Sequence, residues 1–202
     1  MNDAAFTIGH SNHTIERFVE LLKLHGVSRV IDVRSAPYSR WAPQFNREPL
    51  SGSLKRHGIA YEFMGAELGG RSSDPGDYRD GRVDYARLSK SASFSQGIAA
   101  LKERILRNSV AVLCSEGEPT QCHRMLLISR RLKADGIDVR HVLPGGAIAS
   151  QVDLEARILE SHRLHHADLF ASSDETLDRA YRLQEERVAH VRDVAPDSMS
   201  ET

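Results

Sequence analysis

Short apolar runs alternate with longer amphipathic segments along most of the chain. The runs are continuous and rich in β-branched residues, which is typical of strands that are buried on both faces. The longer segments carry apolar residues three or four positions apart, as an amphipathic helix does. The predicted strands are residues 5–8, 29–33, 59–64, 110–114 and 139–143, and the predicted helices are residues 14–24, 50–57, 85–107, 122–134, 152–164 and 173–191.

This alternation of strands and helices predicts right-handed crossovers and a mostly parallel sheet with helices on both faces. We therefore expect an α/β fold of the Rossmann-like or rhodanese-like kind over residues 1–150. Residues 67–82 are rich in Gly, Asp, Ser and Arg and are predicted to form a long irregular loop. After this domain we expect a C-terminal helical extension packed on it over residues 151–195, then a disordered tail over residues 196–202.

The amino-acid composition limits the kinds of molecule that this protein is expected to bind. The 27 basic and 28 acidic side chains leave a net charge of −1, so no overall field attracts nucleic acid or membranes. Two cysteines are too few for a disulfide scaffold. No segment approaches the roughly 20 apolar residues of a membrane span. These features indicate a cytoplasmic protein without a membrane partner, in which any anion site is a local cluster of charge.

Polar side chains follow three of the predicted strands and open one predicted helix. Because the carboxyl ends of parallel strands lie at one edge of a sheet, where ligands bind, we expect these side chains to gather there. The candidate catalytic residues are Cys114, Cys122, His123, Asp32 and His10, and the candidate ligand-binding residues are Ser11, Arg34, Arg71, Glu116 and Arg124.

Cys122 is a candidate thiolate. The positive end of a helix dipole and the neighbouring His123 and Arg124 all favour a lower thiol pKa. Cys114 ends an apolar run, so both core packing and a functional role are open for it. Arg34 is suited to gripping an anion, and it is equally suited to a structural ion pair with a nearby acid. His10 is interpreted as a base or a metal ligand, or simply as a hydrogen-bonding residue.

We assign no metal ligand from the sequence. Cys114, Cys122, His123 and His141 are residue types that bind zinc, but a Cys-x7-Cys-His spacing matches none of the usual ligand patterns. Adjacent Cys and His residues also rarely bind one ion together. Phosphate-loop and dinucleotide-binding motifs are absent from the chain, and the sequence does not specify a cofactor.

Several motifs resemble the domain-of-unknown-function 488 family. They are GHS at residues 9–11, IDVRSAPYSR at 31–40, GIAYEFMGAELGGR at 58–71 and LCSEGEPTQCHR at 113–124. The resemblance spans residues 5–146 and implies an α/β fold. By match to its motifs it implies these site positions: His10, Ser11, Asp32, Arg34, Pro37, Gly69, Gly70, Arg71, Cys114, Glu116, Cys122, His123 and Arg124.

A second resemblance is to rhodanese-like domains. RVIDVRS at residues 29–35 is similar to their Asp-Val-Arg strand, and VAVLCSEG at 110–117, followed by a helix and VRHVLPGG at 139–146, is similar to their cysteine-loop region. In those domains the loop after the cysteine wraps its amides around a sulfur or an oxyanion. This chain departs from that pattern, because its loop is longer and its arginine stands at position 124.

Three functions follow as hypotheses. The leading one is an enzyme acting on a small anionic or nucleotide-like ligand, with a cysteine nucleophile, arginines for the anion and a histidine for proton transfer. The alternatives are a rhodanese-like sulfurtransferase or sulfur carrier and a nucleic-acid-binding module, and a homodimer through the C-terminal helices is a further hypothesis. The nucleic-acid module would use Arg40, Arg47, Arg56 and Arg71 with Tyr38, Trp41 and Phe45.

Overall fold

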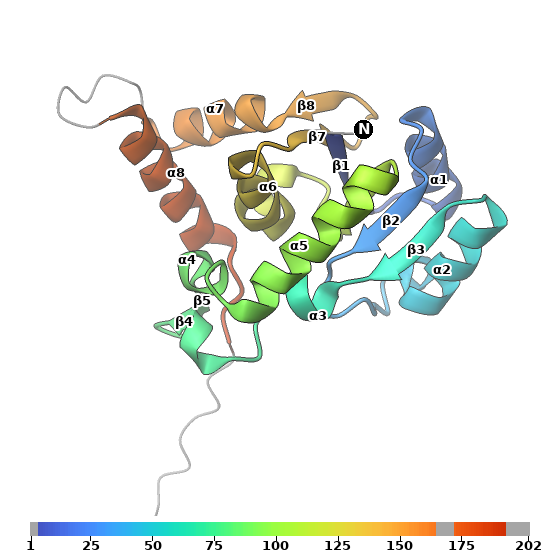
Figure 1. Ribbon diagram of the computed structural model, residues 1–202, viewed down its shortest axis with the longest axis horizontal. Helices are drawn as coiled ribbons and strands as arrows, with labels where there is room; N and C mark the ends of the chain where they lie inside the picture. Colours follow the sequence, from blue (N-terminus) through green and yellow to red (C-terminus); the bar gives the residue numbers. More distant parts are fainter. Residues whose placement is uncertain (1–3, 165–171, 193–202) are drawn as a thin grey trace, which may run out of the picture.

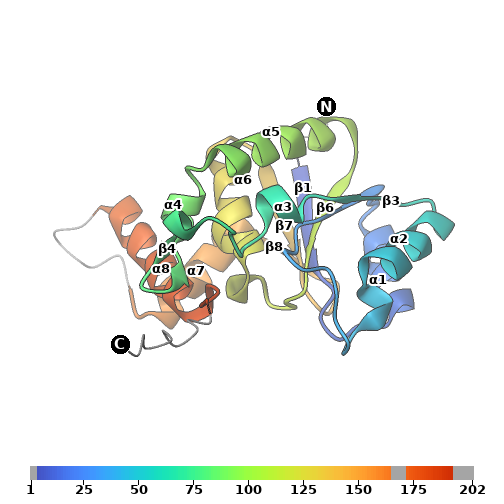
Figure 2. The ribbon, with the colours of Figure 1, turned by 90° about the horizontal axis from the view of Figure 1, so that it is seen from below.

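A six-stranded sheet runs through the centre of the protein in the computed structural model, which describes residues 4–164 and 172–192 (Figures 1 and 2). The strand order is β3-β2-β6-β1-β7-β8, and every neighbouring pair is parallel except β7 and β8. The α/β fold with a mostly parallel sheet is therefore confirmed. The strands are β1 (Ala4–Gly9), β2 (Arg29–Asp32), β3 (Ala60–Phe63), β6 (Val110–Cys114), β7 (Asp138–Val142) and β8 (Ile148–Ser150), and a separate hairpin pairs β4 (Tyr78–Arg79) with β5 (Arg82–Val83).

The helices begin where the sequence offers capping residues. The hydroxyls of Thr14, Ser91, Ser150 and Ser172 each accept a hydrogen bond from the backbone N–H three residues later. At Ser172 the cap is a full capping box, because the Glu175 carboxylate also accepts from the Ser172 backbone N–H. The helices are α1 (Ile15–Leu24), α2 (Arg47–Arg56), α3 (Gly65–Leu68), α4 (Tyr85–Leu88), α5 (Ala92–Arg107), α6 (Arg130–Ala134), α7 (Gln151–Ser161) and α8 (Ser173–Val188).

Apolar side chains on the two faces of the sheet build two separate cores. Helices α1 and α2 cover one face, where their leucines and Phe18 pack against Val30 and Leu113. Helices α5 and α6 cover the other face, whose core includes Ile31 and Val112, and α7 and α8 pack beside them as part of the same apolar cluster (Figure 2). Adjacent residues of β2 and β6 thus point to opposite cores. This is why the two strands are apolar throughout.

The structure departs from the predicted elements in three places. The predicted irregular loop at residues 67–82 contains the end of α3 and the hairpin β4–β5. The predicted helix at 85–107 is two helices, because Ser91 caps a new start by accepting from the N–H of Phe94. Strand β8 was not predicted, because three residues after a Pro-Gly-Gly turn carry too little pattern.

The predicted helix at residues 122–134 has an unusual beginning. It opens with a turn of π-helix at Arg124–Ser129 and becomes α-helical only in α6. The Ser129 hydroxyl donates to the carbonyl of Arg124, five residues earlier, at 2.7 Å. Such π-helical turns are rare in proteins overall, and those that occur are often found at functional sites. Here the π-helical turn directly follows Cys122 and His123.

The C-terminal segment returns to the hairpin beside the carboxyl edge of the sheet. The N–H of Val83 donates to the carbonyl of His190 at 3.0 Å, and the N–H of Arg192 donates to the carbonyl of Gly81 at 2.8 Å. Residues of helices α7 and α8 belong to the same apolar cluster as those of α5. The predicted tail at 196–202 lies outside the described residues. No helix in the described ranges has the length and apolar character to cross a membrane.

Candidate functional site

The central strands bring the predicted site residues to one edge. Gly9 lies level with Cys114, and Asp32 lies level with Leu113, so β1, β2 and β6 end together. A cavity of about 390 Å³ opens at this edge. Six of the candidate site residues line it, namely Arg34, Arg71, Cys114, Glu116, Cys122 and His123. The expected gathering of these six side chains is therefore present.

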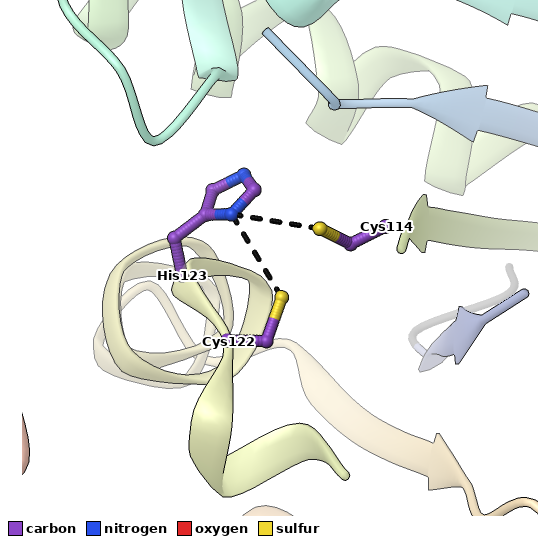
Figure 3. A group of neighbouring side chains, drawn as sticks. All are labelled: Cys114, Cys122 and His123. Carbon is purple, nitrogen blue, oxygen red and sulfur yellow. Dashed lines mark hydrogen bonds between the residues drawn. The ribbon is translucent and has the colours of Figure 1, made fainter. Parts of the chain in front are cut away.

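Two thiols and one imidazole meet in the wall of the cavity, and we call Cys114, Cys122 and His123 the sulfur–imidazole cluster (Figure 3). The Nδ1 atom of His123 lies 3.7 Å from the Sγ of Cys114 and 3.8 Å from the Sγ of Cys122. Cys122 is extended and His123 is helical, so these adjacent side chains converge on one point. The two cysteines form no disulfide.

Hydrogen bonding sets the tautomer of His123. Its Nε2 lies 3.2 Å from the carbonyl oxygen of Val33, and a carbonyl only accepts, so Nε2 carries the proton. The lone pair of Nδ1 therefore faces the two sulfurs. That nitrogen can accept a thiol proton or bind a metal ion. Gly70 packs against the ring, where a Cβ atom at position 70 would lie 2.8 Å from the Cγ of His123.

The two thiols have opposite pKa shifts. Burial opposes ionisation of Cys122, but a hydrogen bond from Cys114, the positive charge of Arg124 and the Arg124 backbone N–H outweigh it and lower the pKa of Cys122 to about 7. That N–H lies 3.4 Å from the Cys122 sulfur. The hydrogen bond to Cys122, followed by burial, raises the pKa of Cys114. The pair therefore favours a single thiolate on Cys122, to which the Cys114 thiol donates.

Arg124 has a different position from the one we expected. Its guanidinium is buried and donates to the carbonyl of Glu116 and, at 3.0 Å, to the carbonyl of Gly117. It therefore holds the loop after β6 in place and does not line the cavity. The same loop lies directly on Gly9, where a Cβ atom would be 1.8 Å from the Glu116 carbonyl oxygen. Only glycine fits at that position.

Asp32 and Arg34 form an ion pair in which each side chain supplies hydrogen-bond partners to the other. We call these two residues, together with Tyr61, the paired group. Arg34 donates from Nε and from a terminal nitrogen to the two Asp32 oxygens at 2.9 and 2.6 Å. The same terminal nitrogen also donates to the Phe45 carbonyl at 2.9 Å, and the Tyr61 hydroxyl donates to Asp32 at 2.8 Å. Burial and the charge of Asp32 raise the pKa of Tyr61. The structural ion pair with Asp32 is thus the alternative that the structure shows for Arg34.

His10 and Ser11 lie beside the cavity without lining it. The His10 ring stacks on Phe45 with 4.5 Å between centroids, and its Nδ1 bonds to the Ser11 carbonyl at 3.0 Å. Burial lowers the pKa of His10 to about 4, so the ring is neutral near pH 7. Ser11 has a left-handed φ of 46° and donates from its hydroxyl to Asn12.

Two further cavity residues come from parts of the sequence that carried no signal. Tyr85 opens α4, and His190 follows α8. The distance along the chain between these residues and the cysteines hides their proximity. His141, which we considered as a zinc ligand, lies elsewhere, where it bonds to Thr7 at 2.8 Å and to Gln151 at 2.7 Å.

The aromatic residues considered for nucleic-acid binding do not form one surface. Trp41 is 82% exposed and stacks with Arg40, whereas Phe45 is fully buried in the core. Arg47 stacks over Phe63 at 4.5 Å from the ring centroid. Only part of the expected base-stacking set is therefore available to a partner.

Fold and site together define a class: an α/β protein with a sulfur–imidazole cluster at the carboxyl edge of its parallel strands. Residues 14–130, more than half of the chain, match the family model described as domain of unknown function DUF488, and the chain belongs to this family. The match includes the whole cluster and the paired group, while His10 and Ser11 precede it. No curated protein and no solved structure matches the chain. The rhodanese-like similarity has no support in these comparisons.

Proposed function

We propose that this chain is an enzyme that acts on a small anionic, nucleotide-like ligand and that the sulfur–imidazole cluster supplies its reacting groups. One observation carries the proposal: two Sγ atoms and an Nδ1 atom lie within 4.8 Å of one another in the wall of a cavity of about 390 Å³. Cavities with a few convergent polar groups are the usual form of an active site. The lone pair of His123 Nδ1 is placed to take a proton from a thiol, and the resulting thiolate is both a nucleophile and a metal ligand.

Arg71 supports the anionic ligand. It is exposed, it lines the cavity, and its guanidinium has no ion pair within the described part of the chain. The guanidinium of Arg34, by contrast, is engaged by Asp32. The backbone N–H of Arg71 donates to the Ser35 hydroxyl at 3.0 Å, which anchors the residue at the cavity mouth. A planar guanidinium there suits a phosphate or carboxylate.

The test measures thiol reactivity and turnover together. Reduced wild-type protein is treated with iodoacetamide, with and without adenosine monophosphate or pyrophosphate, and is then screened against a panel of phosphate esters for product formation by mass spectrometry. We expect slower alkylation when the anion is bound and no turnover in Cys114→Ser or Cys122→Ser protein. Circular dichroism checks that both variants fold. Full turnover in either folded variant would remove that cysteine from the reaction.

A matched arginine pair tests the anion site. Arg71→Gln is expected to weaken binding of adenosine monophosphate by about tenfold, the loss of one charge-assisted contact of about 1.5 kcal/mol. Arg107→Gln is the control, because Arg107 is an exposed arginine at the end of α5, which leads into the opposite edge of the sheet. Equal binding by both variants would contradict the role of Arg71.

A further inference from the structure

We propose that the sulfur–imidazole cluster is a Zn²⁺ site in which Cys114 Sγ, Cys122 Sγ and His123 Nδ1 are the ligands and the fourth coordination position faces the cavity. The proposal rests on the proposed function and deepens it, because it names the ion that would activate a ligand at the same place. It goes against the spacing argument from the sequence. The reasons are the interatomic distances, the local backbone, the surrounding hydrogen bonds and the charge balance.

The distances match zinc coordination. Zn–S bonds of about 2.3 Å and a Zn–N bond of about 2.0–2.1 Å at tetrahedral angles place a sulfur and a nitrogen about 3.6 Å apart. The observed separations from Nδ1 are 3.7 Å to Cys114 and 3.8 Å to Cys122. All three ligand atoms lie within 4.8 Å of one another. Both sulfur–nitrogen separations are therefore within a few tenths of an ångström of the zinc-bound value.

The local backbone explains how adjacent residues share one ion. Cys122 has φ −140° and ψ 140°, whereas His123 has φ −57° and ψ −24°. This change from extended to helical backbone turns the two side chains toward the same point, and Cys114 meets them from the end of β6 (Figure 3). Spacing rules drawn from zinc fingers do not cover this combination of a strand end and a helix start.

The outer groups are arranged as in metal sites. A metal-binding histidine usually donates its other N–H to a carbonyl or carboxylate, and His123 Nε2 donates to the carbonyl of Val33 at 3.2 Å. The backbone N–H of Arg124 points at the Cys122 sulfur at 3.4 Å. Gly70 closes against the ring and limits its movement. The ring is therefore oriented for a ligand before any ion arrives.

Charge balance and ligand type favour Zn²⁺. The ion displaces the two thiol protons to solvent, and two thiolates then neutralise its charge while His123 keeps its proton on Nε2. Thiolate and imidazole are soft and borderline ligands that suit zinc rather than magnesium or calcium. Three protein ligands with one open position is the arrangement of catalytic zinc. The open position lies where a water or an anionic oxygen of the ligand would bind.

The test starts with the unmodified protein. Full-length chain, reduced and freed of metal by a chelator, is titrated with Co²⁺ and then with Zn²⁺ under anaerobic conditions. We expect one equivalent of Co²⁺ per chain with an intense thiolate-to-cobalt absorption band, displacement of the band by Zn²⁺, and one retained Zn²⁺ after dialysis. Absence of the band together with absence of retained zinc in folded wild-type protein would overturn the proposal.

Single variants then assign the ligands. Cys114→Ser, Cys122→Ser and His123→Gln are each expected to weaken Zn²⁺ binding by more than the ~10–100-fold that an outer partner costs. His57→Gln is the control, because His57 is an exposed histidine that caps the end of α2. Retained wild-type affinity in any of the three folded ligand variants would remove that residue from the site.

The two proposals fail separately. Protection of the thiols by adenosine monophosphate in metal-free protein, with no bound Zn²⁺ under any condition, overturns the zinc site and leaves the proposed function standing. One bound Zn²⁺ in a protein that neither binds nor converts any anionic probe supports the zinc site and overturns the proposed function.

Discussion

The paired group and the sulfur–imidazole cluster lie at the same edge of the sheet and have opposite kinds of surroundings. In the paired group, the Asp32 carboxylate accepts from Arg34 and Tyr61 and is fully buried. In the cluster, the Nδ1 of His123 and the two sulfurs face one another and the cavity. Asp32 of the paired group ends β2 and Cys114 of the cluster ends β6, and these neighbouring strands end almost level with each other.

The contrast shows that chemical residue types alone do not make a site. Charges that complete each other's hydrogen bonds inside the protein hold the fold and leave little capacity for a ligand. Groups that keep a lone pair or a thiol toward a cavity retain that capacity. Changes in the paired group should therefore affect mainly stability, and changes in the cluster should affect mainly binding and reactivity.

The largest effect on stability is expected from Asp32→Asn. It leaves the buried Arg34 cation without its carboxylate partner, which costs about 3–5 kcal/mol. Asp138→Asn is the matched control, because Asp138 also pairs with an arginine two residues later, Arg140, but both side chains are about half exposed. The control should cost less than about 1 kcal/mol. Urea denaturation measures both, and equal losses would contradict the structural role of the paired group.

The second prediction concerns the pH dependence of stability. His141 is a buried histidine whose neutral ring has hydrogen-bond partners at both nitrogens. Burial lowers the pKa of His141 from 6.5 to about 4, so the unfolded chain binds its proton at higher pH than the folded chain. The stability from His141 is complete above pH 6.5 and falls as the pH drops toward 4. The loss is on the order of 3 kcal/mol.

The unfolding free energies of wild-type and His141→Gln protein between pH 7 and pH 4 test this sign. We expect the wild-type curve to fall more steeply than that of the variant. His10, whose pKa is also lowered, contributes equally to both curves and cancels in the difference. Parallel curves would show that His141 does not titrate in this range.

The smallest effect on stability is expected from Gly70→Ala, which acts on the cluster without changing any charge. The added Cβ would lie 2.8 Å from the His123 ring, and the hydrogen bond to Val33 restrains that ring. Overpacking of this kind costs about 1–3 kcal/mol. The alkylation rate of the cysteines should change as well, since the added Cβ displaces the imidazole that lies against them.

Gly52→Ala is the control for this change. Gly52 lies within α2, and an added Cβ would meet only Arg56, at an ordinary distance of 3.8 Å. Alanine is the better helix former, so we expect a gain of about 0.5–1 kcal/mol and unchanged thiol reactivity. If Gly70→Ala changed stability and thiol reactivity no more than Gly52→Ala does, the close packing of Gly70 on His123 would play no part in the cluster.

Local patterns in the sequence were enough to predict much of the fold. The apolar runs at 29–33 and 110–114 predicted β2 and β6, and the helix predicted from residue 173 begins where α8 begins. The break between α4 and α5 was missed, because apolar spacing continues across it while the cap at Ser91 decides the outcome. Strand β8 was missed because it is stabilised by pairing with β7, a long-range contact.

The sequence predicted most of the residues that lie at the candidate site, but it did not predict which of them bond to one another. Both the anion role and the ion-pair role of Arg34 agreed with the sequence, and only the 2.6 Å contact with Asp32 distinguishes them. Arg124 was predicted to bind a ligand from the start of a helix, yet its guanidinium is bonded to carbonyls of the loop after β6. Tyr85 and His190 reach the cavity through contacts between elements that are distant in the chain.

By itself, the sequence determined the strands, the caps and the collection of thiols, guanidinium groups and acids at the strand ends, because periodicity and capping act over a few neighbouring residues. Only the tertiary structure decided which of these side chains are already partnered and which still face a cavity. That distinction depends on contacts within about 4 Å between residues far apart in sequence, such as Val33 with His123. Local patterning does not carry that information.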